Sequence, residues 1–475
     1  MNEVKPNFHV LNEEIKKKIF EEAKKILSEI GIFVENQECS EIFKNEGFSK
    51  KENRFLIPPD IVEKCLQSVP HEIKMYDREG KQFLNLQDDQ VHFNPGSAAI
   101  FILDDETGEL REPTMNDFIR FTKITDLLEN IEMQSTALVY SDVPKEAQDW
   151  HRLYIALMYC SKPIITGTFR KESFSIMKEL LLKFRTSEKD LANKPLAIFD
   201  ACPSPPLKWS DLTTQSLIDA AKSMIPSEFV SMPLAGASAP MTLIGSITQH
   251  CAECLAGIVI TQLTNKGAPV IWGGSPAIMD MKFGTTPMGA IETIMINIGN
   301  TEMGKFFNLP THAYMSLSDS KIFDAQAGLE GAMGALLAGL TGINVVSGPG
   351  MLDFESTQSL EKLVVDNEII GMVKRFLQGI EIHEEPFALN ILRDVIETEN
   401  FLSHPSTLKY FRKELFFVSP VIDRRSRDSW KEEGGLNIRK RAQKIIKKLG
   451  LRKPRTPIDE HVKKELDSLV NENLK

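Results

Sequence analysis

The stretch THAYMSLSDSKIFDAQAGLEGAMGALLAGL (311–340) decides the fold, because it contains one complete strand–helix unit. It begins as a buried strand, passes through the charged residues Asp319, Lys321 and Asp324, and continues as a helix of Ala, Gly and Leu. That helix contains Gly328, Gly331, Gly334 and Gly339. Interior glycines cost roughly 1 kcal/mol each relative to alanine. Four of them predict close packing against a neighbour, with a barrel wall favoured over a second protein or a flat cofactor.

Apolar runs of this kind recur along the chain, each ending in small or polar residues, with helical segments between them. Seven runs cover residues 131–139, 163–169, 195–206, 229–240, 269–280, 309–321 and 343–353, and an eighth covers 92–103. Strands that alternate with helices predict βα units and a parallel sheet. Eight units predict an α/β protein with a (β/α)₈ TIM barrel, whose active site lies at the C-terminal ends of the strands. The polar segment 316–324 is then expected on the functional face, with a solvated loop as the alternative.

The segments outside the predicted barrel lack the alternation of apolar strands and helices. Residues 11–30 have the apolar spacing of an amphipathic helix, and glycines at 80 and 108 mark two hairpin-like turns. We therefore expect an N-terminal helical and hairpin extension over 1–90, a barrel over 91–380 and a C-terminal helical tail over 381–475. Residues 421–454 contain twelve Lys or Arg and four Asp or Glu. This basic run indicates a solvated helix face or a surface that docks an acidic partner.

Composition restricts the class of protein. The chain has 475 residues, of which 42% are hydrophobic and 26% charged, and its net charge is -10. These values are typical of a soluble globular protein and do not favour nucleic-acid binding. The N-terminus has no apolar segment typical of a signal peptide, and no uncharged apolar run reaches 18 residues, so no membrane span is expected. Six scattered cysteines predict a reduced, cytoplasmic protein. Phosphate-binding loop motifs are absent from the sequence.

One candidate metal motif is QHCAEC (249–254), in which His250, Cys251 and Cys254 have the types of side chain that bind zinc. A zinc site that activates a thiol for methyl transfer is one hypothesis. Buried cysteines in a well-packed helix are the favoured alternative. No GxSxG motif indicates a serine hydrolase.

Aromatic residues near the strand runs suggest a different ligand. Trp272, Tyr314, Phe354 and Phe93 lie in or beside these runs. Aromatic faces bind quaternary ammonium groups by cation–π attraction, worth roughly 0.5–2 kcal/mol for each ring. Acidic residues at strand ends add charge complementarity, although each aromatic residue alone is also typical of a core.

Three long segments together resemble the trimethylamine methyltransferase family. They are PVIWGGSPAIMDMKFGTTPMGAIE (269–292), SLSDSKIFDAQAGLEGAMGALLAGLTGIN (316–344) and SGPGMLDFESTQSLEKLVVDNEIIGMVKRF (347–376). The resemblance extends over most of the chain, to HPSTLKYFRKELFFVSPVIDRRSRDSW (404–430). It implies a (β/α)₈ barrel that transfers a methyl group from a methylated amine to the cobalt of a corrinoid protein. Founding members carry pyrrolysine, whereas this sequence has only standard residues and so resembles the branch that demethylates quaternary amines.

The resemblance and the residues together define the expected site. Substrate binding is assigned to Trp272, His312, Tyr314, Phe354, Asn94 and Phe93, and corrinoid or pocket contact to Asp319, Lys321, Asp324, Gln326 and Asp353. The expected substrate is glycine betaine, with proline betaine and carnitine as alternatives. The cofactor is a corrinoid carried by a partner protein, and no metal is expected in this chain. A noncatalytic betaine-binding or corrinoid-docking protein is a further alternative. No nucleic-acid or membrane partner is expected, and self-association is left open.

Overall fold

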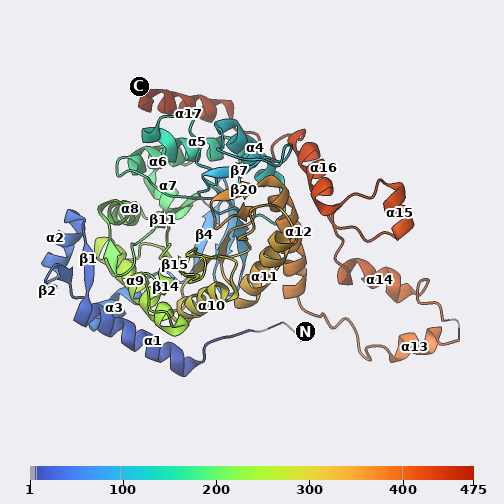
Figure 1. Cartoon of the computed structure of the whole chain (residues 1–475), viewed down its shortest axis with the longest axis horizontal. Coiled ribbons are helices and arrows are strands. Elements are labelled where there is room, and N and C mark those ends of the chain that lie inside the picture. The colour runs from blue at the N-terminus through green and yellow to red at the C-terminus, as the bar shows by residue number, and fades with distance from the viewer. Residues whose placement is uncertain (1–5, 7, 97, 398, 475) are drawn as a thin grey trace.

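The computed structural model describes residue 6 and residues 8–474, except residues 97 and 398. Eight parallel strands form the central sheet of the molecule (Figure 1). Their spatial order is β6-β18-β17-β15-β13-β11-β10-β9. Their bounds are β6 His92–Asn94, β9 Gln134–Ser135, β10 Ile164–Thr166, β11 Ala197–Ala201, β13 Ser227–Phe229, β15 Val270–Gly274, β17 Thr311–Tyr314 and β18 Val345–Ser347. The carbonyl oxygen of Phe93 in β6 accepts hydrogen bonds from the backbone N–H groups of Glu132 (2.9 Å) and Met133 (3.2 Å), just before β9. These bonds join the two edges, so the predicted (β/α)₈ barrel is confirmed.

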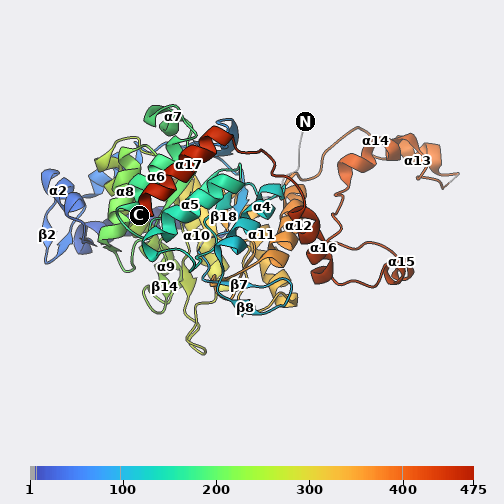
Figure 2. The ribbon, with the colours of Figure 1, turned by 90° about the horizontal axis from the view of Figure 1, so that it is seen from above.

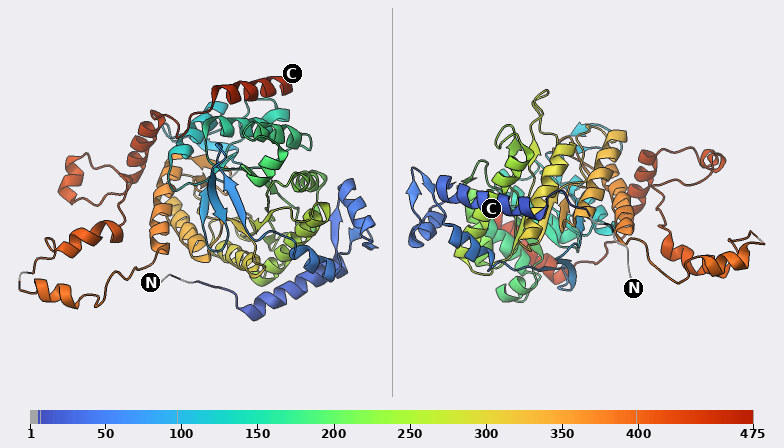
Figure 3. Two further views of the ribbon diagram at one scale, coloured as in Figure 1. Left: turned by 180° about the vertical axis from the view of Figure 1, so that it is seen from behind. Right: turned by 90° about the horizontal axis from the view of Figure 1, so that it is seen from below.

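A helix or helix pair follows every barrel strand and packs outside it (Figures 1 and 3). These helices are α4 Met115–Leu127, α5 Gln148–Tyr159, α6 Ser173–Leu182, α7 Glu188–Asn193, α8 Asp211–Lys222, α9 Leu243–Thr264, α10 Ile291–Phe306, α11 Ala325–Thr341 and α12 Leu360–Leu377. Of the described helices, only α9 is long and apolar enough to cross a membrane. It is 83% buried in its most apolar window and packs against α1, α3, α8 and α10, so it is a core helix.

The strand–loop–helix unit around α11 has the close packing that its glycines predict. A Cβ atom on Gly334 would lie 2.6 Å from the backbone nitrogen of Ser316, and one on Gly339 would lie 2.7 Å from Val373 of α12. Only glycine permits these approaches. Gly328 is different, because nothing lies within 4 Å of the same position. The helix is therefore seated on the loop after β17 and on α12.

Residues before the barrel pack against its side and, through one hairpin, close its N-terminal end. The helix predicted over 11–30 consists of α1 (Glu13–Lys25) and a π-helical turn, Ile26–Ile30. The elements that follow are β1 Ile32–Val34, α2 Gln37–Asn45, β2 Lys50–Lys51, β3 Arg54–Phe55 and α3 Pro59–Leu66. The hairpin predicted around Gly80 is formed by β4 (Ile73–Tyr76) and β5 (Gln82–Leu86). Its apolar side chains pack against the lower barrel residues Met133, Ile165, Ile198, Ile271 and Val345. The open end of the barrel is therefore the one with the C-terminal strand ends.

Short strands lie in the segments that follow the barrel strands at that open end. The second predicted hairpin, around Gly108, is β7 (Phe101–Leu103) paired with β8 (Leu110–Arg111). The remaining strands are β12 Lys208–Trp209, β14 Leu234–Ala235, β16 Ala277–Ile278, β19 Met351–Leu352 and β20 Thr357–Ser359, and a 3₁₀ turn covers Lys145–Ala147.

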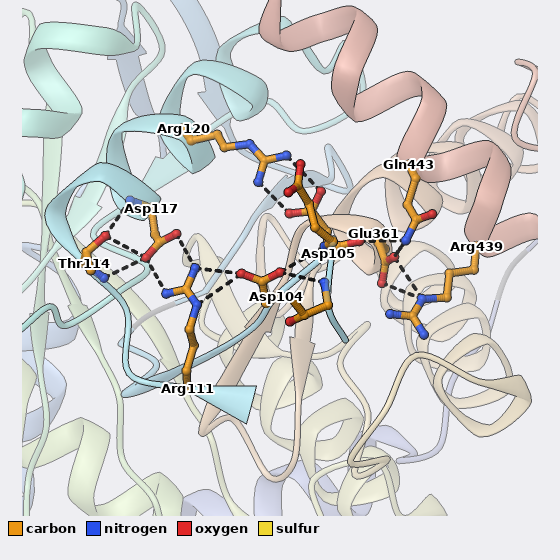
Figure 4. Close-up of polar contacts among 11 residues, drawn as sticks. Asp104, Asp105, Arg111, Thr114, Asp117, Arg120, Glu361, Arg439 and Gln443 are labelled. Carbon is orange, nitrogen blue, oxygen red and sulfur yellow. Dashed lines mark hydrogen bonds and ion pairs between the residues drawn. The ribbon is translucent and has the colours of Figure 1, made fainter. Parts of the chain in front are cut away.

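The C-terminal tail is helical and is partly anchored to the barrel. Its helices are α13 Leu389–Val395, α14 Pro405–Glu414, α15 Arg427–Glu432, α16 Ile438–Gly450 and α17 Glu460–Asn473. Figure 4 shows the anchor of α16, where the buried Glu361 accepts hydrogen bonds from Arg439 (2.9 Å) and Gln443 (2.6 Å). The same view shows Arg111 held between Asp104 and Asp117, which ties the β7–β8 hairpin to α4. The division of the chain at residues 90 and 380 stays a prediction.

Candidate active site

The interior of the barrel changes from apolar to polar toward its open end. Above the apolar layer, inward positions of the strands are occupied by Asp200, Glu228, His312, Ser347 and Asn94. β15 contributes Gly273, where a Cβ atom would lie 2.7 Å from the Cβ of His312. Because this glycine leaves room, the side chains of Glu228 on β13 and His312 on β17 meet across β15, with 3.5 Å between Oε1 and Nε2.

Two carboxyl groups lie next to each other in this polar layer. Asp200 and Glu228 are register partners on neighbouring strands, and Glu228 is completely buried. No N–H or hydroxyl group of the described residues donates a hydrogen bond to either carboxylate oxygen of Glu228. Burial, followed by the adjacent Asp200 carboxyl, raises the pKa of Glu228 well above its usual value. Burial and the neighbouring carboxyl therefore both disfavour a second negative charge on this pair.

His312 is neutral in this environment. Burial lowers its pKa to about 3. The Asn94 amide donates to Ser347 Oγ at 2.8 Å, and Ser347 Oγ lies 3.0 Å from His312 Nε2. The tautomer of His312 decides whether Ser347 Oγ or Nε2 donates in this contact, and Nδ1 has no hydrogen-bond partner among the described residues. The Tyr314 ring packs edge-on against the imidazole at 5.3 Å.

A strained loop lies over this interior. Asp353, Phe354 and Glu355 follow β18 and β19 with φ values of 49°, 56° and 71°. Three consecutive non-glycine residues in the left-handed region are unfavourable and are typical of functional sites. Burial raises the pKa of Glu355 to about 8, and Ser275 donates to its carboxylate at 3.1 Å. Lys321 Nζ lies 3.7 Å from the centre of the Phe354 ring.

The charged segment after β17 organises the rim of the barrel. Asp319 accepts hydrogen bonds from the N–H groups of Met288 (2.8 Å) and Gly289 (2.9 Å), and burial raises its pKa to about 6. Asp324 caps the N-terminus of α11, and Gln326 is exposed and donates to Glu330. The Lys321 side chain is 60% exposed and lies 3.6 Å from Asp353. Three of these side chains therefore face solvent at the rim of the barrel, those of Lys321, Asp324 and Gln326. The Asp319 side chain is instead buried against the backbone of residues 288 and 289.

A buried guanidinium lies beside the C-terminal end of β9. Arg152 of α5 is 1% exposed and donates to the carbonyl oxygens of Thr136 (2.8 Å) and Gln148 (3.1 Å). The Phe169 ring, 4.4 Å away, covers it. The carboxyl groups of Asp149 and Asp200 favour its charged form. Burial lowers the pKa of Arg152 to about 10, so the group stays charged at neutral pH and is a candidate donor for an anion.

The other two aromatic residues assigned to substrate are not in the interior. Trp272 packs outside the barrel wall, with its ring 5.2 Å from that of Phe307, and its Nε1–H donates to the carbonyl oxygen of Asn300. Phe93 is buried in the outer core with Phe118 and Phe121. Neighbouring strand residues point to opposite sides of the sheet. The structure therefore brings Asn94, His312 and Tyr314 together and separates Trp272 and Phe93 from them.

The QHCAEC motif lies in the middle of the core helix α9. His250, Cys251 and Cys254 are fully buried. His250 Nε2 and Cys254 Sγ both contact the carbonyl oxygen of Gly273, at 3.0 and 3.4 Å. Over the described residues, no three His, Cys, Asp or Glu side chains are placed to hold a metal ion. The packing interpretation accounts for all three residues.

The most informative residues of the site, Asp200 and Glu228, are absent from the sequence-based assignment. Each is a single acid within a short apolar run, in AIFDA (197–201) and SEF (227–229). The run predicted at 229–240 begins one residue after Glu228, so the acid falls outside it. A charged side chain inside a predicted buried strand was the available signal, because such groups are almost never buried without a partner.

Comparisons with known proteins agree with this architecture. Residues 1–474 match the family model described as "Trimethylamine methyltransferase (MTTB)". A trimethylamine methyltransferase of Desulfitobacterium hafniense is 30% identical over 450 residues, covering 94% of this chain and 90% of the relative. A glycine betaine methyltransferase of the same species is 29% identical, with 91% and 90% covered. The monomethylamine methyltransferase of Methanosarcina barkeri matches in structure with a TM-score of 0.56, at 13% identity, over 94% of this chain and 90% of its own.

Proposed function

Because this chain belongs to the trimethylamine methyltransferase family, we propose that it transfers a methyl group from a quaternary amine to the Co(I) of a corrinoid. The corrinoid is carried by a partner protein in the cytoplasm, and a tertiary amine is released. The observation that carries the proposal is the Asp200–Glu228 carboxyl pair at the open end of the barrel, in which Glu228 is fully buried and receives no hydrogen bond from an N–H or hydroxyl group of the described residues. A buried carboxylate beside a second acid favours a cation as its ligand, and a quaternary ammonium supplies charge without any N–H.

The chemistry of a quaternary amine matches these groups. Its nitrogen cannot donate a hydrogen bond, so it is held by charge and by contact. The carboxyl pair supplies charge, and the Tyr314 ring supplies a face for cation–π attraction. Transfer breaks the C–N bond, and its electron pair stays on nitrogen, so the leaving group is a neutral amine and no proton is required. The contribution of the chain is therefore to position the cation and to exclude water.

The methyl acceptor would approach from the open end of the barrel. The reduced cobalt of the corrinoid supplies the nucleophile. Lys321, Asp324 and Gln326 have side chains at the rim and, with Asp319 and Asp353, are proposed to contact the partner or to shape the entrance. Phe354 lies in the same loop as Asp353, and its ring contacts the Lys321 ammonium group. We propose that this ring forms one side of the substrate pocket.

We expect purified protein to methylate free cob(I)alamin, or a cognate corrinoid protein, under anoxic conditions. The change in the corrinoid absorption spectrum would be followed while glycine betaine, proline betaine, carnitine and trimethylamine are added separately. Methylation with a quaternary amine and none with trimethylamine is the expected result. No reaction with any of the four, with the cognate corrinoid protein present, would refute the proposed function.

Glycine betaine is the proposed substrate because it adds a carboxylate to the cation. Arg152 is a buried cation that can bind that carboxylate. We expect Arg152→Met to raise the KM for glycine betaine at least tenfold, since a hydrogen bond to a charged group contributes about 1.5–3 kcal/mol. The KM for tetramethylammonium, which has no carboxylate, should stay unchanged.

Arg152→Lys is the matched control, because it keeps the charge and should recover part of the affinity for glycine betaine. Equal rises in KM for both compounds would assign Arg152 to the structure of the barrel wall and would remove it from substrate recognition.

A further inference from the structure

A segment of the C-terminal tail exposes apolar side chains that nothing in the described structure covers. This segment, residues 380–397, is called the arm and contains α13. Ile380, Phe387 and Ile396 are 70%, 68% and 66% exposed, and Leu389 and Leu392 are 50% and 43% exposed. Val395 is the one buried residue of α13. A helix of 7 residues is not stable alone in water, and α13 meets α14 through Asp394 and His404 while these apolar side chains stay exposed.

The arm is also acidic. It contains Glu381, Glu384, Glu385, Asp394 and Glu397, against a single cation, Arg393. Figures 1 and 2 show the arm directed away from the barrel. Its base contacts α14, where His383 Nε2 lies 2.5 Å from Glu414 Oε1 and the His383 ring stacks on that of Tyr410. A partner for the arm must therefore offer apolar contact and positive charge.

The same chain has a groove with both properties. This cavity, called the tail groove, has a volume of about 860 Å³ and lies between α16, residues 416–425 and the ends of α4 and α12. Its apolar lining includes Leu128, Val364, Phe416 and Ile445. Its basic lining consists of Arg424, Arg425, Arg441, Lys444, Lys448 and Arg452.

Several of these cations have no partner of their own. The side chains of Lys444, Lys448 and Arg452 make no hydrogen bond or ion pair with any residue that the structure describes. The groove also contains four acids. Asp423 and Glu433 are paired with Arg425, Glu368 accepts the Ser419 N–H, and Glu129 is the fourth. The uncompensated charge of the tail groove is therefore positive and concentrated on the last turns of α16.

We propose that the arm of one copy of this chain docks in the tail groove of a second copy. The apolar face of α13 would cover the apolar lining, and the acids of the arm would face Lys444, Lys448 and Arg452. The arm points away from its own body, which favours a second copy as the occupant (Figure 3). Each copy has one arm and one groove, so reciprocal exchange about a two-fold axis closes in a dimer.

Charge reversal tests this pairing with the full-length protein. Lys444→Glu/Lys448→Glu makes the groove acidic, and Glu385→Lys/Glu397→Lys makes the arm basic. Sedimentation velocity should show a dimer for the unaltered chain and at least tenfold weaker association for each double variant alone. Mixing the two variants should restore a dimer, because both arm–groove contacts then join opposite charges.

Lys440→Glu/Lys447→Glu is the matched control, since both residues lie on α16 and outside the groove lining. It should associate like the unaltered chain. A monomer at all concentrations would overturn the proposal and would indicate docking within one chain or another partner. Association that is insensitive to the groove substitutions, or not restored by mixing, would also overturn it.

Discussion

Replacing Glu228 by glutamine should lower kcat/KM for the quaternary amine by about 10²–10³-fold, the usual effect of removing one preorganised electrostatic group. The carboxyl is fully buried and lies 3.5 Å from a neutral imidazole, so its loss leaves Asp200 as the neighbouring acid that faces the cation. Steady-state kinetics with the corrinoid acceptor at saturation would measure the loss.

The pH dependence gives the same substitution a second readout. The raised pKa of Glu228 means that the empty site holds a proton that a bound cation displaces. The KM for the quaternary amine should therefore fall as pH rises, and this dependence should flatten in Glu228→Gln. A KM that is independent of pH in the unaltered protein would contradict the shared proton.

The free energy of unfolding of Glu228→Gln shows whether the loss of activity comes from the lost charge or from a damaged fold. An acid whose pKa is raised by folding stabilises the folded state at low pH, and this contribution is lost as pH rises through the folded pKa. At neutral pH the buried carboxyl is costly to ionise, and glutamine in its place carries no charge. The free energy of unfolding of Glu228→Gln near neutral pH should therefore not be lower than that of the unaltered protein. Glu253→Gln is the matched control, because Glu253 is also buried but accepts hydrogen bonds from Leu207 and Gln249. It should leave the KM unchanged.

The second large effect is expected in stability. Trp272→Ala should lower the free energy of unfolding by about 3–5 kcal/mol, the usual cost of truncating a buried Trp. The ring is fully buried outside the barrel wall, and a Cβ atom on Gly304 of α10 would lie 2.6 Å from it. Chemical denaturation would measure the change.

Trp272→Phe should lower stability less, because it leaves a smaller cavity. At a temperature where the variant is folded, its KM for a quaternary amine should match that of the unaltered protein. A large rise in KM with unchanged stability would instead assign the ring to the substrate, as the sequence pattern suggests.

The sequence by itself determined the architecture. All eight predicted apolar runs contain or adjoin a barrel strand, and the eighth, at 92–103, contains β6. The spacing of apolar residues, and the polar residues, glycines and prolines that end each apolar run, are local properties of the sequence. A buried strand such as Thr311–Tyr314 and a small-residue helix such as Ala325–Thr341 can therefore be predicted without any tertiary information. The segment after β17 was likewise predicted at the barrel mouth, since the C-terminal ends of parallel strands share one edge.

Only the tertiary structure decided which side chains meet inside the barrel. Trp272 and Gly273 are adjacent in sequence, yet one is packed outside the wall and the other makes room inside it for His312 and Glu228. The reason is that side chains alternate across a sheet, so a shift of one residue in phase exchanges the inner and outer faces. The surroundings of Glu228 are formed by Asp200, Gly273 and His312, which lie on three different strands. The sequence lists those strands, and closure of the barrel places them together.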